Sequence, residues 1–136
     1  MKIKLDTEAI RYITLFETLT GAIVKDCIVE DNKILFIVKE GYAGIAIGKN
    51  GKNVKKLNEI LNKEIEVLEF SEDPITFVSN IFKPLKVKNA YFGENPERGK
   101  ILYIQTMKSH PLARSKLRKA RMMLAKYFGI NEVVLV

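Results

Sequence analysis

Residues 43–57 read AGIAIGKNGKNVKKL, and this stretch decides how the fold is interpreted. The tetrad Gly48-Lys49-Asn50-Gly51 separates two segments of helical character, a short apolar one (residues 41–47) and a basic one (residues 52–63). Glycine costs helix stability, but it allows positive φ angles and leaves no β-carbon in front of the main-chain amides. Together with the N-terminus of the following helix, such amides form a site of positive partial charge that suits a phosphate.

The side chains around the tetrad suit a single strand of nucleic acid. Lysines in and after the tetrad add full positive charges, and two isoleucines just before it offer an apolar wall for bases. Proteins grip single strands by combining a basic track for phosphates with an apolar surface for bases. The residues predicted to contact RNA here are Ile45, Ile47, Gly48, Lys49, Asn50, Gly51, Lys52 and Lys55.

Three other interpretations of the tetrad fit less well. Asn-Gly is a strong hairpin signal, but the flanking residues have helical rather than alternating periodicity. A nucleotide P-loop needs four residues between its glycines and a Ser or Thr after the lysine, whereas three residues separate Gly44 from Gly48 and Asn50 follows Lys49. A dinucleotide-binding fingerprint lacks the glycine two residues before Gly48. The remaining candidate is the GXXG loop of a KH domain, which clamps four nucleotides of backbone.

The elements predicted around the tetrad form one unit. An amphipathic helix over residues 5–21, with Asp6 or Thr7 as its cap, precedes a hairpin of strands 24–30 and 33–40 that turns at Asp31-Asn32. The two helices beside the tetrad follow, with Val54, Leu57 and Leu61 on one face of the second. A strand over residues 64–70 closes the unit.

The same order of elements then repeats. Asp73-Pro74 is a helix start that opens residues 74–82, and strands 85–92 and 100–106 follow, joined by the turn-rich GENPERG. A helix over 111–128, with Gly129 at its end, leads to a last strand, 131–136. KILFIV at 33–38 matches KILYIQ at 100–105, a shift of 67 residues. We therefore expect an α+β fold of two domains, residues 1–71 and 72–136, each a three-stranded mixed sheet with helices on one face.

The second copy departs from the first at the loop. The shift of 67 residues places Ser115-Lys116-Leu117-Arg118 at the tetrad, so both glycines are lost and residues 111–128 are expected to run as one nearly continuous helix. We assign its buried face to Leu117, Ala120, Leu124 and Phe128. Side-chain charge then replaces the loop in RNA binding, with solvation of the helix as the alternative. The candidate residues are Arg114, Lys116, Arg118 and Arg121.

The signature IAIGKNGKNVKKL and the order of elements resemble the prokaryotic, type II KH domain. Two such units in a chain of this length, with VKEGYAGIAIGKNGKNVKKL and the SEDP junction, resemble the archaeal NusA-like transcription factors. This resemblance implies a non-catalytic factor that binds single-stranded nascent RNA, with RNA polymerase as a further candidate partner, and acts in termination or antitermination. A KH protein of ribosome assembly or translation is the alternative that the sequence leaves open.

Composition supports a polyanionic partner. The net charge is +7, and residues 73–136 carry 12 Lys and Arg against 4 Asp and Glu, whereas residues 1–72 carry 11 against 12. No apolar run is long enough to cross a bilayer, and one cysteine with one histidine makes no zinc-ligand set. An enzyme would need a nucleophile, a paired-carboxylate metal site or a placed general base, and the sequence shows none. We expect a cytoplasmic monomer that has neither metal nor cofactor and does not contact a membrane.

Four smaller features have a structural interpretation beside a functional one. We expect Cys27 to be a packed thiol and His110 to lie at a helix start, with a phosphate contact as the alternative for the histidine. The acidic cluster is expected to be a solvated junction, with a partner surface as its alternative. The aromatic residues of the second unit would stack bases if exposed, but core packing is favoured. These two groups are Glu66, Glu69, Glu72 and Asp73, and Tyr91, Phe92 and Tyr103.

Overall fold

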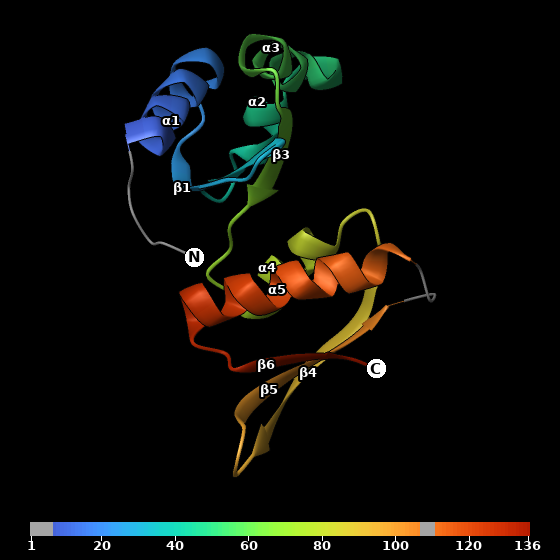
Figure 1. Cartoon of the computed structure of the whole chain (residues 1–136). Coiled ribbons are helices and arrows are strands. Elements are labelled where there is room, and N and C mark those ends of the chain that lie inside the picture. Colours follow the sequence, from blue (N-terminus) through green and yellow to red (C-terminus); the bar gives the residue numbers. More distant parts are fainter. Residues whose placement is uncertain (1–6, 107–110) are drawn as a thin grey trace. The chain divides into compact units, whose positions relative to one another are not determined.

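The computed structural model describes residues 7–106 and 111–136, which form two compact units, Met1–Ser71 (unit 1) and Glu72–Val136 (unit 2). Figure 1 traces the chain through them. Both units run helix, strand, strand, helical segment, strand, and this helical segment is interrupted only in unit 1. The predictions of a cap at Asp6 and of a helix-start role for His110 lie outside the described residues.

Unit 1 is a three-stranded sheet combined with three α-helices. The sheet order is β1-β2-β3, with β1 antiparallel and β3 parallel to the central strand β2. The first two strands form the hairpin predicted at Asp31-Asn32. In chain order the elements are α1 (Thr7–Thr20), β1 (Val24–Val29), β2 (Lys33–Val38), α2 (Ala43–Ile47), the 3-10 turn η1 (Lys49–Gly51), α3 (Lys52–Leu61) and β3 (Glu64–Glu69).

The core of unit 1 lies between its helices and one face of the sheet. Alternate residues of β2, namely Ile34, Phe36 and Val38, join Phe16 of α1 and Leu57 of α3 in one buried cluster. The rings of Phe16 and Phe36 stack with their centroids 4.1 Å apart. Full burial of one such side chain contributes roughly 1.5–3 kcal/mol to stability. This cluster therefore fixes α3, and the loop that precedes it, against the sheet.

Unit 2 repeats the plan with a single long helix before its last strand. Its sheet order is β4-β5-β6, again with one antiparallel and one parallel pairing, and Figure 1 shows α5 lying across one face of this sheet. The elements are α4 (Pro74–Phe82), β4 (Val87–Asn95), β5 (Gly99–Thr106), α5 (Leu112–Phe128) and β6 (Glu132–Leu135). The predicted α+β class with two three-stranded mixed sheets is confirmed.

Helix α4 begins where Asp73-Pro74 predicts. The Asp73 carboxylate accepts hydrogen bonds from the Thr76 hydroxyl, at 2.7 Å, and from the Thr76 backbone N–H, at 3.3 Å, and Pro74 occupies the first turn. The hydroxyl bond, followed by the backbone bonds, lowers the pKa of Asp73. The carboxylate thus satisfies a backbone donor that the start of a helix leaves without a partner.

The strands of the two units match with a shift of 68 residues rather than the predicted 67. In unit 1, Phe36 faces the helices, whereas Tyr103, its counterpart at a shift of 67, is only half-buried. The fully buried residues of the second sheet are instead Leu102, Ile104 and Val133. Matching letters align the sequences, but packing aligns faces, and a shift of one residue moves every side chain to the other face of a strand.

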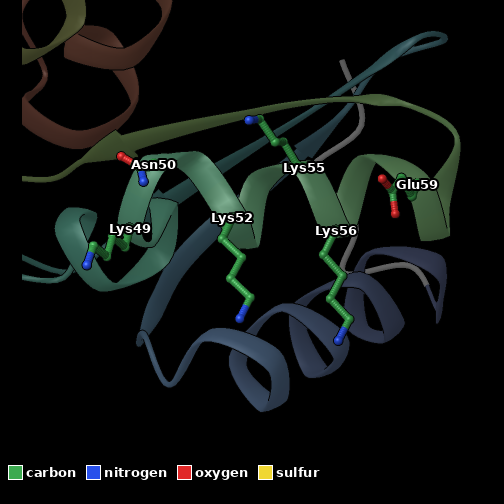
Figure 2. Close-up of a pocket in the computed structure, with 6 residues that line it drawn as sticks. All are labelled: Lys49, Asn50, Lys52, Lys55, Lys56 and Glu59. Atoms are coloured by element: carbon green, nitrogen blue, oxygen red, sulfur yellow. The ribbon is translucent and has the colours of Figure 1, made fainter.

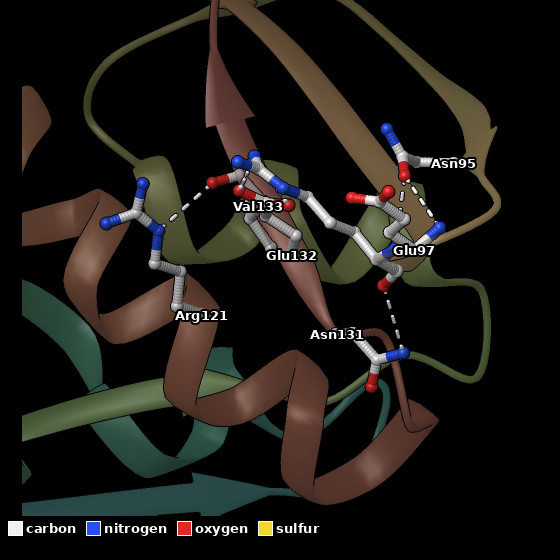
Figure 3. A network of polar contacts seen from close by, with 7 residues as sticks. Asn95, Glu97, Arg121, Asn131, Glu132 and Val133 are labelled. Atoms are coloured by element: carbon white, nitrogen blue, oxygen red, sulfur yellow. Dashed lines mark hydrogen bonds and ion pairs between the residues drawn. The ribbon is translucent and has the colours of Figure 1, made fainter.

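The turn between β4 and β5 is shorter than the predicted GENPERG. β4 continues to Asn95 and β5 begins at Gly99, so three residues remain between the strands. The side-chain oxygen of Asn95 accepts hydrogen bonds from the backbone N–H groups of Glu97, at 2.8 Å, and Arg98, at 3.1 Å (Figure 3). Such bonds let an asparagine replace backbone pairing in a tight turn. The result is one long two-stranded ribbon.

Helix α5 is continuous, as predicted, but its buried face is rotated from the predicted one. Leu117 and Phe128 are only half-buried, whereas Ala120 and Leu124 are buried as expected. The remaining positions of the buried face, which the sequence pattern does not single out, are Ala113 and Met123.

Candidate nucleic-acid interface

The GKNG loop, residues 48–51, joins α2 to α3 in a backbone conformation that requires glycine. The φ angles of Gly48, Asn50 and Gly51 are 80°, 55° and 73°. Side chains with a β-carbon rarely adopt this left-handed region, and asparagine is one of the few non-glycine residues that does. The identities of three of the four loop residues therefore follow from the path of the backbone.

Asn53, in the first turn of α3, closes the loop from the other side. Its side-chain amide Nδ2 donates a hydrogen bond to the backbone oxygen of Ile45 at 2.9 Å. A β-carbon added at Gly48 would lie 3.0 Å from the Asn53 backbone nitrogen and side chain. Glycine at position 48 thus lets the end of α2 approach the start of α3, and Asn53 links the two. The sequence analysis did not identify this residue, because the contact joins positions eight residues apart.

The N-terminus of α3 has no side-chain cap. Its N-cap residue is Gly51, and no side chain accepts a hydrogen bond from the first turn. The first backbone N–H groups of a helix lack intrahelical partners and carry the positive end of the helix dipole. An anion at this position would take the place of the missing cap.

Lysine side chains surround this helix start in an open groove of about 500 Å³, which we call the lysine groove. Figure 2 shows Lys52 and Lys56 pointing to the same side of α3, whereas Lys55 points to the other. In the described part of the chain, no carboxylate lies within ion-pair distance of the four lysines of the groove. The residues that line the groove are Lys49, Asn50, Lys52, Lys55, Lys56 and Glu59. Four ammonium groups against one carboxylate make it strongly attractive to phosphate.

The two isoleucines before the loop are both exposed, as an apolar contact with bases requires. The exposed fractions are 51% for Ile45 and 41% for Ile47. Both lie on α2, and residues two apart on a helix point to different sides. The pair therefore offers two separate apolar contacts rather than the single wall expected from the sequence. Lys56, which the sequence analysis left out, joins the site because it lies one helical turn after Lys52.

Unit 2 has no counterpart of the loop. α5 continues through residues 115–118, so it offers no free helix start there. Arg114 and Arg118 are exposed one turn apart on this helix, whereas Lys116 is half-buried and lies off their stripe. Any contact with an anion on this helix would come from side chains alone.

Arg121 differs from the other arginines of α5 because it is tied to the sheet. Its Nε donates a hydrogen bond to the backbone oxygen of Val133 at 3.0 Å (Figure 3). The N–H of Val136 donates to Ile104 in β5, so the Val133 carbonyl, three residues earlier, lies on the outer edge of β6. Arg121 thus satisfies a carbonyl of an edge strand, which gives it a structural role as well as a charge.

The smaller features of unit 1 have structural partners. Cys27 is half-buried against the core of the unit. Glu66 forms an ion pair with Lys33, and this hydrogen bond is the main cause of a raised pKa of Lys33. The Glu69 carboxylate accepts a hydrogen bond from the N–H of Ala43 at 3.2 Å, at the start of α2. Across residues 7–106 and 111–136, no three His, Cys, Asp or Glu side chains gather as a metal-binding set. None of the described helices combines the length and apolar character needed to cross a membrane.

Comparison with known proteins places the GKNG loop in a family. A model of the KH domain family matches residues 10–90, more than half of the chain. Two archaeal proteins named "Probable transcription termination protein NusA" are 48% identical over 91 residues (Methanococcus vannielii) and 37% identical over 95 residues (Halococcus morrhuae). The chain belongs to the KH domain family, in its archaeal NusA-like group. A KH domain is an RNA-binding module, so membership indicates RNA binding.

The extent of these KH matches differs between relatives. The match covers 67% of this chain and 53% of the Methanococcus vannielii protein, and 70% of this chain and 68% of the Halococcus morrhuae protein. The chain thus spans about half the length of the first of these relatives. A solved structure, "Crystal structure of APE1850", is 34% identical with a TM-score of 0.79, and the match covers 97% of this chain and 100% of that one. The likeness to this structure therefore includes both KH units.

Proposed function

We propose that this protein is a transcription factor that grips single-stranded nascent RNA through the GKNG loop of unit 1 and affects termination or antitermination. The observation that carries the proposal is the uncapped start of α3, reached through a glycine loop and surrounded by four lysines. A phosphate bound there would meet backbone N–H groups and ammonium groups together. This arrangement binds and positions RNA, and the proposal assigns it no catalytic step.

In the proposed mechanism each residue of the loop has a separate task. Gly48 and Gly51 let the backbone approach the phosphates, while Lys49, Lys52 and Lys55 neutralise them. Ile45 and Ile47 contact the unstacked bases. We further propose that residues 1–71 and 72–136 act as two KH domains and that exposed arginines of α5 replace the glycine clamp in the second. RNA polymerase is the proposed protein partner, and the cytoplasm the proposed place of action of a monomer.

A competition experiment tests the proposal. Binding of a labelled single-stranded RNA to the full chain is challenged with unlabelled single-stranded RNA or with duplex RNA of the same sequence. Single-stranded RNA should compete more strongly, because a KH clamp needs bases that are unstacked and accessible. Binding should weaken as salt increases, with a slope of roughly −0.7 per phosphate neutralised. Equal competition by the duplex would mean unspecific attraction to a basic surface and would contradict the proposal.

A further inference from the structure

The β4–β5 ribbon exposes two aromatic rings, against the expectation that they pack in the core. The exposed fractions are 46% for Tyr91 and 37% for Phe92. Both belong to β4, an edge strand, and as consecutive residues they point to opposite faces of the ribbon. Burial of large aromatic side chains is strongly favourable, so exposure of two of them on one strand calls for an explanation.

The ring of Tyr91 is held in place by its cross-strand neighbour. Tyr91 pairs with Tyr103, and their rings stack with centroids 5.2 Å apart and planes 21° apart. A β-carbon added at Gly93 would lie 2.7 Å from the Tyr103 ring, so glycine leaves the space in which that ring lies flat on the sheet. The pair forms a platform that is ordered before any ligand arrives, so little conformational entropy is lost on binding.

Positive charge surrounds these rings. The Lys100 ammonium lies 4.5 Å from the centroid of the Phe92 ring. Between residues 83 and 100 all the charged side chains are exposed, and five of them are basic, namely Lys83, Lys86, Lys88, Arg98 and Lys100, against the two acids Glu94 and Glu97. Aromatic faces interleaved with cations are the features that bind unpaired bases together with their phosphates.

We propose that the β4–β5 ribbon is a second contact surface for single-stranded RNA, on which the Tyr91–Tyr103 platform stacks an unpaired base. The ring of Tyr91 supplies the stacking face, and the exposed cations of the ribbon attract the adjoining phosphates. This surface lies in unit 2, away in sequence from the GKNG loop, and it requires neither a glycine loop nor the arginines of α5. It accounts for exposed aromatic residues that the clamp does not use.

Fluorescence tests the platform directly, because the chain contains no tryptophan. The Tyr91→Trp variant carries the only indole, and stacking of a base on it should quench its emission when a single-stranded RNA of about 20 nucleotides is added to the full chain. The control is Val136→Trp, an exposed position just after β6 at the other edge of the same sheet. Quenching of the first indole and not of the second supports the proposal. Equal quenching of both, or none at the Tyr91 position, overturns it.

Affinity supplies a second, independent measurement. Stacking of one base on an aromatic ring is worth about 1–3 kcal/mol, so Tyr91→Ala should weaken binding of the 20-nucleotide RNA about fivefold or more. Tyr91→Phe, which keeps the ring, should bind as the parent does. A tetranucleotide that fills only the clamp should bind Tyr91→Ala and parent equally. If Tyr91→Ala binds the long RNA like the parent while substitutions in the GKNG loop abolish binding, the platform is wrong and the proposed function stands.

Discussion

At the scale of residues, Asn53 links the two sides of the GKNG loop. Its side chain holds the carbonyl of Ile45 at the end of α2, and its backbone nitrogen faces Gly48 closely enough to exclude a side chain there. The loop lies between these two contacts, so its amides should keep the direction that a phosphate needs. Preorganised donors of this kind bind an anion without a cost of reordering. We therefore regard Asn53 as a positioning residue of the proposed clamp.

Asn53→Ala should loosen the loop and weaken RNA binding several-fold. Loss of one exposed hydrogen bond should lower the free energy of unfolding by only about 1 kcal/mol. The matched control is Asn58→Ala, because Nδ2 of Asn58 donates to the backbone oxygen of Lys63 at 2.7 Å beyond the other end of α3. It should lose similar stability and keep full RNA affinity. RNA titrations with hydrogen exchange of residues 48–51 distinguish the two variants. Equal affinity losses would contradict the positioning role.

The contrast between Gly48 and Asn53 shows what a sequence reveals at this scale. Two glycines three residues apart between helical segments are a local signal, and the positive φ angles at both confirm that the backbone requires them. The role of Asn53 depends on how α2 and α3 meet in space, which its neighbours in sequence do not encode. The exposure of Tyr91 is equally nonlocal, because apolar residues of a strand are predicted to be buried unless the rest of the fold leaves their face open.

At the scale of elements, α5 shows how unit 2 departs from unit 1. Without glycines the helix runs unbroken through the position of the loop, so unit 2 offers side chains where unit 1 offers backbone amides. The continuous helix was predictable from the loss of both glycines. The 68-residue match of the strands was not, since KILFIV and KILYIQ align best one residue away from the alignment that matches buried faces. A strand that is apolar on both faces gives no clear signal of which face meets the helices.

Arg114→Ala combined with Arg118→Ala should weaken RNA binding without unfolding unit 2, because both side chains are exposed. If each arginine neutralises one phosphate, the salt slope should become shallower by about 0.7 for each. Arg121→Ala should behave differently and lower the free energy of unfolding by about 1 kcal/mol, because it leaves the Val133 carbonyl without this donor. Salt-dependent titrations and thermal melts check both. If the double variant keeps its RNA affinity but no longer captures purified RNA polymerase, the arginines serve the polymerase.

At the scale of the whole molecule, the clamp and the charge excess lie in different halves. The GKNG loop belongs to residues 1–72, which are nearly neutral, whereas residues 73–136 carry the basic excess together with the exposed aromatic rings. Long-range attraction from the second half would raise the rate at which RNA arrives, while the loop would hold the phosphates at short range. The repeat, its α+β class and the loop were accessible from sequence because each rests on periodicity or on glycine. The second half differs in the features that depend on tertiary exposure.

The most direct test of the clamp replaces Lys49 and Asn50 with aspartate and measures affinity for single-stranded RNA. Both glycines remain, and Asp, like Asn, tolerates the left-handed conformation at position 50, so circular dichroism and melting temperature should change little. Two negative charges at the start of α3 should repel the phosphate. The matched control, Lys39→Asp with Asn32→Asp, makes the same charge change at two exposed positions outside the lysine groove. The account predicts a loss of more than tenfold, about 1.4 kcal/mol, for the loop variant and a much smaller loss for the control. Parental affinity in the loop variant, or an equal loss in both, would show that the GKNG loop is only a turn.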